Sequence, residues 1–232
     1  MCGRYNVTDN MAVRNMMADL GTPLYQQDKF IFSPDHSPGS TISIIRRVGD
    51  EVVVSDAIWW LMLDPATLKP NPKYASFNSR SDKLYTPRSL AYRPYRETRC
   101  IIPASAFIEG LGDGKTYHKI HFPNLAIAFG GVYKEWMNPD TGETVLSASI
   151  ITCPPIPQWA DIHPKSCPLI LHEQPSIRQA WLDPAITDVR QFDRLLAWGM
   201  PYHHLVTPIG KVSKWNEIGN PMGYPASPFP EK

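Results

Sequence analysis

The second residue of the chain, Cys2, stands directly before Gly3 and Arg4. Methionine aminopeptidases remove an initiator methionine that precedes a small residue, so we expect Met1 to be removed and Cys2 to become the first residue. Its α-amine, with an ordinary pKa of about 7.7–8.0, is then partly neutral at physiological pH. Such an amine condenses with an aldehyde to a Schiff base, and the thiol on the adjacent carbon can close a five-membered thiazolidine ring.

From its position alone, Cys2 is better explained as a coincidence than as a reactive residue. Its two neighbours shift the interpretation towards a reactive role. Gly3 lets the backbone come close to a ligand. Arg4 brings a guanidinium, whose planar fork matches phosphate oxygens. We therefore interpret Cys2 as a reactive centre for an aldehyde that lies next to a phosphate.

A basic stretch begins just after Asn78. Between positions 80 and 99, six basic residues minus two acidic ones give a local charge of +4, on a chain whose net charge is +1. The basic residues are Arg80, Lys83, Arg88, Arg93, Arg96 and Arg99, and three tyrosines lie among them. Cations that meet phosphates and rings that stack on bases suit single-stranded nucleic acid. A solvated charged face is an equally good interpretation of the same residues.

Two further residues have side chains that can move protons. Glu109 ends an apolar run and is followed by Gly110, and His163 lies between Asp161 and Pro164. A carboxyl group in an apolar setting has a raised pKa and can exchange a proton near neutrality. A histidine next to an acid can serve as a general acid or base. Taken alone, Glu109 is better explained as a turn carboxylate and His163 as a structural residue.

The elements that must position these groups follow from hydrophobic patterning. Apolar runs predict strands at 41–46, 51–61, 99–102, 117–122, 125–133, 144–152, 167–171 and 202–208. Helical spacing predicts a helix over 8–20 that ends at Gly21, and capping boxes at 176–179 and 188–191 predict two later helices. Residues 140–142 predict a hairpin turn, while 64–74 and the residues after 211 predict loops. The pattern indicates an α+β fold, with one mostly antiparallel β domain and peripheral helices.

Composition excludes several classes of protein. With 43% hydrophobic residues the chain can form a core, and its net charge of +1 leaves any nucleic-acid site to a local patch. The sequence has neither a bilayer-spanning apolar run nor a secretory signal, so we expect a cytoplasmic protein without membrane contact. The cysteines lack CxxC spacing, which predicts no metal site, and we expect Cys100, Cys153 and Cys167 to be buried thiols.

Taken together, these segments resemble the SRAP (SOS-response-associated peptidase) family. The resemblance rests on the order of residues 1–4, then 78–80, then 99–104 ahead of 107–109, then 162–163 ahead of 168–171. It extends from Cys2 to about residue 216. The chain has Trp59–Trp60, Glu109–Gly110 and His163–Pro168 where the family usually has Trp-Gly, Glu-Trp and His-x-Arg-Met-Pro.

The resemblance implies a single SRAP domain with a β-barrel-like core, which we place at residues 2–220, before a proline-rich tail at 221–232. It implies covalent capture of abasic sites in single-stranded DNA, through a thiazolidine at Cys2, by a monomer without cofactors that would lie near the nucleoid in a bacterium. Asn78 would hydrogen-bond near the adduct, Glu109 would assist proton transfer, and His163 would protonate or stabilise the opened sugar. The residues implied to contact DNA are Gly3, Arg4, Arg80, Arg88 and Thr152.

Two other functions are compatible with the same residues. A cysteine peptidase would use Cys2 as nucleophile and His163 as base, either on its own Met1 or on peptides. A non-catalytic DNA-binding module would use only the basic stretch from Arg80 to Arg99.

Overall fold

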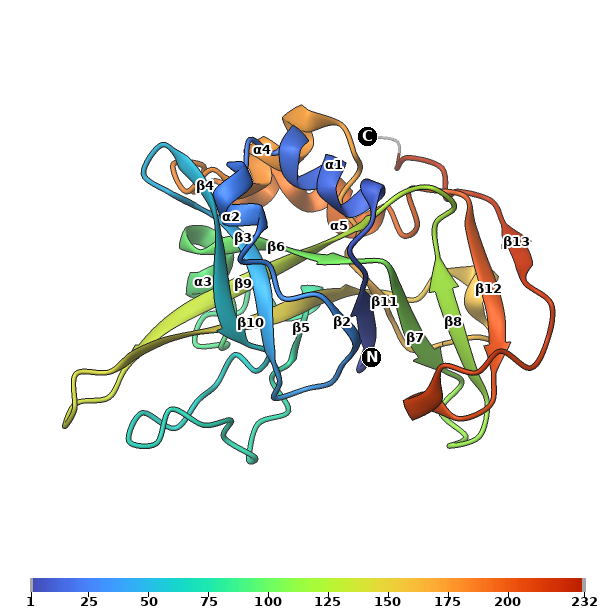
Figure 1. The fold of residues 1–232 in the computed structure, drawn as a ribbon, viewed down its shortest axis with the longest axis horizontal. Helices are drawn as coiled ribbons and strands as arrows, with labels where there is room; N and C mark the ends of the chain where they lie inside the picture. The colour runs from blue at the N-terminus through green and yellow to red at the C-terminus, as the bar shows by residue number, and fades with distance from the viewer. Residues whose placement is uncertain (1, 231–232) are drawn as a thin grey trace.

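The protein is described here by a computed structural model that covers residues 2–230 (Figure 1). Its core consists of two β-sheets. The first contains β3 (Thr41–Val48), β4 (Glu51–Ile58), β5 (Asn78–Arg80), β6 (Arg99–Ala104), β9 (Ile127–Met137), β10 (Thr144–Cys153) and β11 (Cys167–Pro168). The second contains β1 (Tyr5–Val7), β2 (Ser33–His36), β7 (Ala106–Gly110), β8 (Tyr117–His121), β12 (His204–Ile209) and β13 (Met222–Tyr224).

Five strands of the first sheet close into a barrel. Antiparallel pairing joins β4 to β3, β3 to β6, β6 to β9 and β9 to β10. A parallel bridge between Ser147 and Ile58 joins β10 back to β4 and completes the ring. β5 also pairs with β10 in parallel, and β11 pairs with it in the antiparallel sense. The α+β class and the mostly antiparallel, barrel-like core are therefore confirmed.

The second sheet is packed against the barrel through aromatic side chains. The chain passes from β6 into β7 with only Ser105 between them, so one continuous stretch serves both sheets. Tyr5 of β1 contacts Trp59 and Phe129 with ring centroids 5.0 and 6.0 Å apart, and Phe107 of β7 contacts Phe129 at 5.4 Å. All four rings are buried. Burying such large apolar surfaces is the main favourable term that holds the two sheets together.

The helices are peripheral, as expected. They are α1 (Met11–Asp19), α2 (Leu24–Gln27), α3 (Tyr92–Glu97), α4 (Pro175–Leu182) and α5 (Asp193–Ala197). In Figure 1, α1, α2, α4 and α5 gather at one end of the sheets, while the β9–β10 hairpin extends to the side. Asn10 begins α1 by accepting a hydrogen bond from the amide of Val13 at 3.0 Å, and Gly21 follows its end with a φ of +81°. None of the helices within residues 2–230 is long and apolar enough to cross a bilayer.

Most of the predicted elements are confirmed, with differences at the ends. The capping box at 176–179 is wrong, because α4 begins at Pro175 and its N-cap makes no side-chain hydrogen bond. At 188–191 only the cap is confirmed: the Asp188 carboxylate accepts from the amide of Arg190, but it begins a 3₁₀ helix (Val189–Phe192), and the Gln191 side chain donates to the Asp188 carbonyl instead of completing the box. The stretch after 211 is more ordered than a surface loop, because it contains a 3₁₀ turn (Val212–Lys214) and β13. The domain boundary at residue 220 stays a prediction, and residues 231–232 of the tail lie outside the described residues.

The basic stretch does not form one surface. Arg99 is buried, and its guanidinium donates to the backbone carbonyls of Trp181, Tyr95, Arg96, Asp183 and Ile186. Elsewhere in the stretch, Arg93 pairs with Glu97, and Arg96 lies over the ring of Tyr92 at 3.8 Å. Arg99 therefore holds α3 and α4 against the barrel, and a DNA-binding module that uses the whole stretch is not what the fold provides.

The substitution Arg99→Ala should lower the free energy of unfolding by about 3–5 kcal/mol, because it leaves several buried carbonyls without a donor. Urea denaturation followed by circular dichroism would measure the change. Arg93→Ala, which removes an exposed arginine from the same stretch, is the matched control and should leave the urea midpoint nearly unchanged. Equal midpoints for the two variants would contradict the structural role of Arg99.

Candidate active site

The backbone around Cys2 is held along β7. Tyr5 lies opposite Phe107 in the antiparallel β1–β7 pair, and the amide of Ile108 donates to the carbonyl of Arg4 at 2.9 Å. Continuing this register places Gly3 opposite Glu109. The N-terminal stretch and the carboxyl group that the sequence singled out therefore meet at one end of the β1–β7 pair. Met1 and its expected removal lie outside the described residues.

Asn78 reaches the same point from the other sheet. β5 pairs in parallel with β10, with Asn78 opposite Ile150 and Arg80 opposite Thr152. The Asn78 side-chain amide donates to the carbonyl of Cys2 at 2.8 Å. Its Oδ1 is buried and accepts no hydrogen bond within residues 2–230. Asn78 thus fixes the Cys2 backbone and keeps one acceptor available beside it.

Cys2 itself is fully buried. Burial raises the pKa of its thiol well above the ordinary value, and the nearby negative charge of Glu109 raises that pKa further. A thiol in this setting stays protonated near neutral pH. Any reaction that uses the sulfur therefore needs a group that takes its proton.

Glu109 and His163 form the proton-handling part of the site. The Glu109 carboxyl is 1% exposed, and burial raises its pKa to about 7. His163 Nδ1 lies 3.6 Å from Glu109 Oε2 and 2.5 Å from the carbonyl oxygen of Gly110. Because a carbonyl oxygen only accepts, Nδ1 carries the proton, which leaves Nε2 as the acceptor facing the Ser166 hydroxyl at 3.4 Å. Burial lowers the pKa of His163, which favours this neutral form.

Two hollows flank Arg80 at the edge of this site. The first, with a volume of about 410 Å³, is lined by Lys73, Tyr74, Asn78, Arg80, Lys83 and Leu90, among others. The second, of about 440 Å³, is lined by Arg80, Ser81, Thr152, Cys153, Lys165 and Ser166, among others. Thr152 is almost fully buried, and its hydroxyl makes no hydrogen bond within residues 2–230. Cations and hydroxyls that converge on such hollows suit phosphate oxygens.

The structure brings together Cys2, Asn78, Glu109 and His163, with Arg80 and Thr152 beside them. Two of the residues implied to contact DNA, Arg4 and Arg88, are not part of this group. Arg4 Nε pairs with the carboxylate of Asp35 at 3.1 Å, which already neutralises its charge. Arg88 is exposed with a φ of +71°, on the turn that leads to the wall of the first hollow.

Sequence reasoning missed several residues that line the site. Lys165 and Ser166 follow His163 closely and line the second hollow, while Lys73 and Tyr74 come from the long predicted loop and line the first. The Cys167 thiol also lies near Glu109. Burial, and to a lesser extent the negative charge of Glu109, raises the pKa of this thiol to about 12. Proximity to His163 is the only sequence signal that points to Lys165. Cys100, Cys153 and Cys167 are buried free thiols, as expected.

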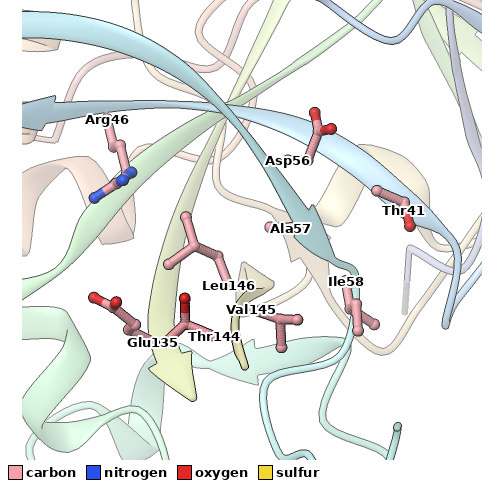
Figure 2. A pocket seen from close by; sticks show the side chains of 9 residues that line it. All are labelled: Thr41, Arg46, Asp56, Ala57, Ile58, Glu135, Thr144, Val145 and Leu146. Carbon is pink, nitrogen blue, oxygen red and sulfur yellow. The ribbon is translucent and has the colours of Figure 1, made fainter. Parts of the chain in front are cut away.

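A separate hollow of about 450 Å³ lies where β3 and β4 diverge from the β9–β10 hairpin (Figure 2). Its charged side chains are Arg46, Asp56 and Glu135, and its floor is apolar. Arg46 already donates to the Ser55 hydroxyl at 2.9 Å and lies over the ring of Tyr133. Neither a cysteine nor a histidine is among its described lining residues, so its chemistry does not match that of the Cys2 site.

The chain is similar to known proteins over most of its length. A family model described as "SOS response associated peptidase (SRAP)" matches residues 1–214. The abasic site processing protein YoqW of Bacillus subtilis is 26% identical over 208 residues, which cover 84% of this chain and 86% of that protein. The abasic site processing protein YobE of the same organism is 32% identical over 148 residues, which cover 62% of this chain and 64% of that protein.

Solved structures share the fold. A protein of Bordetella bronchiseptica superimposes with a TM-score of 0.67 at 19% identity, covering 90% of this chain and 100% of that one. A protein of Bacteroides thetaiotaomicron superimposes with a TM-score of 0.64 at 23% identity, covering 84% and 86%.

The raised pKa of Glu109 predicts a pH-dependent stability. The unfolded chain releases this proton near pH 4.5, whereas the folded chain keeps it until about pH 7. Wild type should therefore lose stability relative to Glu109→Gln as the pH rises from 4.5 to 7, by at most about 3 kcal/mol, with no further change above pH 7.

Urea denaturation of both proteins at intervals between pH 4 and pH 8 would measure this difference. Glu143→Gln changes an exposed carboxylate and should give a pH-independent difference from wild type. A Glu109→Gln difference that is equally flat would show that Glu109 titrates normally in the folded protein.

Proposed function

The chain belongs to the SOS response associated peptidase (SRAP) family, and on this premise we propose that it processes abasic sites in single-stranded DNA by forming a covalent crosslink through Cys2. The observation that carries the proposal is the convergence of Cys2, Asn78, Glu109 and His163 next to hollows lined by cations, one of which Asn78 lines and the other of which Ser166, the neighbour of His163, lines. An abasic site in its ring-opened form presents an aldehyde between two phosphates. The site offers an amine and a thiol for the aldehyde and cations for the phosphates.

The proposed reaction has two steps and no redox change. After removal of Met1, the α-amine of Cys2 attacks the aldehyde carbon, and loss of one water gives a Schiff base. The sulfur of Cys2 then bonds to the same carbon while the thiol proton moves to the nitrogen. The product is a thiazolidine whose mass equals that of protein plus DNA less one water.

Glu109 supplies the proton transfers that both steps need. With a pKa of about 7, it exists in both protonation states near neutral pH, so it can donate to the departing water and accept from the buried thiol. His163 offers its Nε2 as an acceptor, since Nδ1 is committed to the carbonyl of Gly110. Asn78 Oδ1 is placed to accept a hydrogen bond from the amine or from a hydroxyl of the opened sugar.

The two hollows on either side of Arg80 would hold the strand that flanks the lesion. Arg80 is exposed, and its guanidinium lies with Asp82, from which a phosphate can draw it at low cost. Thr152 and Lys165 add a hydroxyl and an ammonium on one side, and Tyr74 adds a ring for base stacking on the other. These contacts suit an unpaired strand, whose bases are free to enter a hollow.

A cysteine peptidase fits the site less well. Such an enzyme needs a thiolate and a protonated imidazole, which a lowered thiol pKa provides. Here burial raises the pKa of Cys2 and lowers that of His163, so both groups favour their neutral forms. Neutral amine and thiol groups are what aldehyde capture uses. Peptide cleavage in trans, in the absence of DNA, would support the peptidase instead.

Cys2→Ala should lose the crosslink that survives heating, because no thiol remains to close the ring. The variant keeps an α-amine at residue 2, so borohydride should still trap its Schiff base with an abasic single strand. Denaturing gels after heating would measure the stable product, and intact mass spectrometry would confirm both the removal of Met1 and the loss of one water. Cys100→Ala removes another buried thiol and should crosslink like wild type. A heat-stable crosslink by Cys2→Ala at the wild-type rate would refute the thiazolidine.

Glu109→Ala and Asn78→Ala should each slow crosslinking by about 10²–10⁴-fold, the first because proton transfer becomes limiting and the second because the hydrogen bond that fixes Cys2 is lost. The rates would be measured from single-turnover time courses with an abasic oligonucleotide in excess over protein. Glu135→Ala, which changes a carboxylate in the hollow of Figure 2, is the control and should leave the rate unchanged. A Glu109→Ala rate equal to that of Glu135→Ala would remove Glu109 from the reaction.

A further inference from the structure

The segment 225–230 lies on the protein surface with a three-residue repeat. Its neighbour Tyr224 and the residues Ser227 and Pro230 are half-buried, while Pro225, Ala226, Pro228 and Phe229 are exposed. A polyproline II helix has three residues per turn, so one side of it faces inward at every third position. Burial of every third residue fits an extended segment of polyproline II type that lies against the protein.

Two side chains, Arg194 of α5 and Trp198 at the C-terminal end of that helix, donate hydrogen bonds to backbone carbonyls of this segment. The indole nitrogen of Trp198 donates to the carbonyl of Ser227 at 3.1 Å. The Arg194 guanidinium donates to the carbonyl of Pro230 through Nε at 3.1 Å and Nη2 at 2.6 Å. The amide of Ser227 donates to the carbonyl of Met200 at 2.7 Å. Polyproline II helices make no internal hydrogen bonds, so their carbonyls are free for such recognition.

The segment also packs against the protein through the aromatic ring of Phe229. Phe229 meets Trp198 edge to face, with ring centroids 4.5 Å apart, and Arg194 lies over the Phe229 ring at 4.1 Å. His172 stacks on Trp198 at 5.2 Å and on Tyr202 at 5.1 Å, which braces the indole. An indole and an arginine on a braced platform are typical of grooves that recognise proline-rich peptides.

The segment fills this surface only in part. Beside it lies a hollow of about 530 Å³, whose walls include Pro154, Pro155, Pro157, Trp198, Pro228 and Pro230; we call it the proline hollow. Phe229, the largest side chain of the segment, is 42% exposed. A peptide that takes the segment's place, supplies the walls that Pro228 and Pro230 now form and carries one more large apolar side chain would bury that side chain in the proline hollow.

We propose that Arg194, Trp198 and the proline hollow form a binding site for extended proline-rich segments of a partner protein, and that residues 225–230 occupy this site in cis. The proposal is independent of the chemistry at Cys2. Pro154 and Pro155 line the proline hollow and also the hollow beside Arg80. A partner bound to this site would sit behind the wall of the Cys2 site without covering it.

Because residues 225–230 already occupy the site, a partner must bind it more tightly than they do. A tethered segment competes at an effective concentration on the order of millimolar, so only a ligand with added contacts displaces it. Weakening the segment within the full-length chain should therefore expose the site to peptides that wild type binds poorly.

The test uses a synthetic peptide with the sequence of residues 224–230 and three full-length proteins: wild type, a tail-weakened variant (Pro228→Gly, Phe229→Ser, Pro230→Gly), and that variant with Arg194→Gln. Binding is followed by the indole N–H resonance of Trp198, assigned with Trp198→Phe. The tail-weakened variant should bind with a Kd of about 0.1–1 mM, wild type about two- to tenfold more weakly because its own segment competes at about 1 mM, and the Arg194→Gln form about tenfold more weakly than its parent.

A second peptide, with every proline replaced by alanine, controls for polyproline II structure and should bind the tail-weakened variant about tenfold more weakly. Urea midpoints equal to wild type would show that each variant is folded. The proposal is overturned if the tail-weakened variant shows no binding of the first peptide at a peptide concentration of about 5 mM. That concentration is about ten times the middle of the expected range of Kd. It is also overturned if both peptides bind alike, if wild type binds as well as the variant, or if Arg194→Gln has no effect.

Discussion

The short antiparallel pairing between β1 and β7 decides where chemistry can take place in this protein. It runs the residues that follow Cys2 along β7 (Ala106–Gly110), so Cys2 and Glu109, the proposed nucleophile and proton carrier, share one end of a sheet. β7 is itself continuous with barrel strand β6, and its aromatic residues pack on the barrel. The position of Cys2 is thus tied to the best-buried part of the fold. Cys2, the proposed reactive residue, is thereby pre-organised at low entropic cost.

Burial at that point sets the protonation states on which the proposed reaction depends. Desolvation raises the pKa of Cys2 and Glu109 and lowers that of His163, so near neutral pH the Cys2 thiol and the His163 imidazole favour their neutral forms and Glu109 is present in both forms. Neutral groups suit condensation with an aldehyde, in which protons are exchanged and no ion persists. The same burial costs folding stability above pH 4.5, because the folded chain holds the Glu109 proton that the unfolded chain releases.

Charged residues are divided between holding the fold and facing the solvent. Arg99 binds five carbonyls in the interior and Arg194 binds the C-terminal segment, whereas Arg80 and Lys165 line hollows beside the site. This division explains how a chain of net charge +1 has a cationic edge, on which the proposed contacts to DNA depend. It also separates the two proposed binding surfaces, which share only the wall at Pro154 and Pro155.

The sequence by itself determined which reactive groups exist, their order, and most of the strands, because side-chain type carries the chemistry and two-residue alternation carries the strands. Cys2 could be named from its chemistry, whereas Asn78, Glu109 and His163 were singled out as a set only by an order of motifs that resembles the family. Only the tertiary structure decided that Arg99 is structural, that Thr152 faces Arg80, and that Arg4 is paired with Asp35. Those roles depend on burial and on partners that are not neighbours in the local pattern: backbone carbonyls for Arg99, Asp35 for Arg4, and the parallel β5–β10 pairing for Thr152.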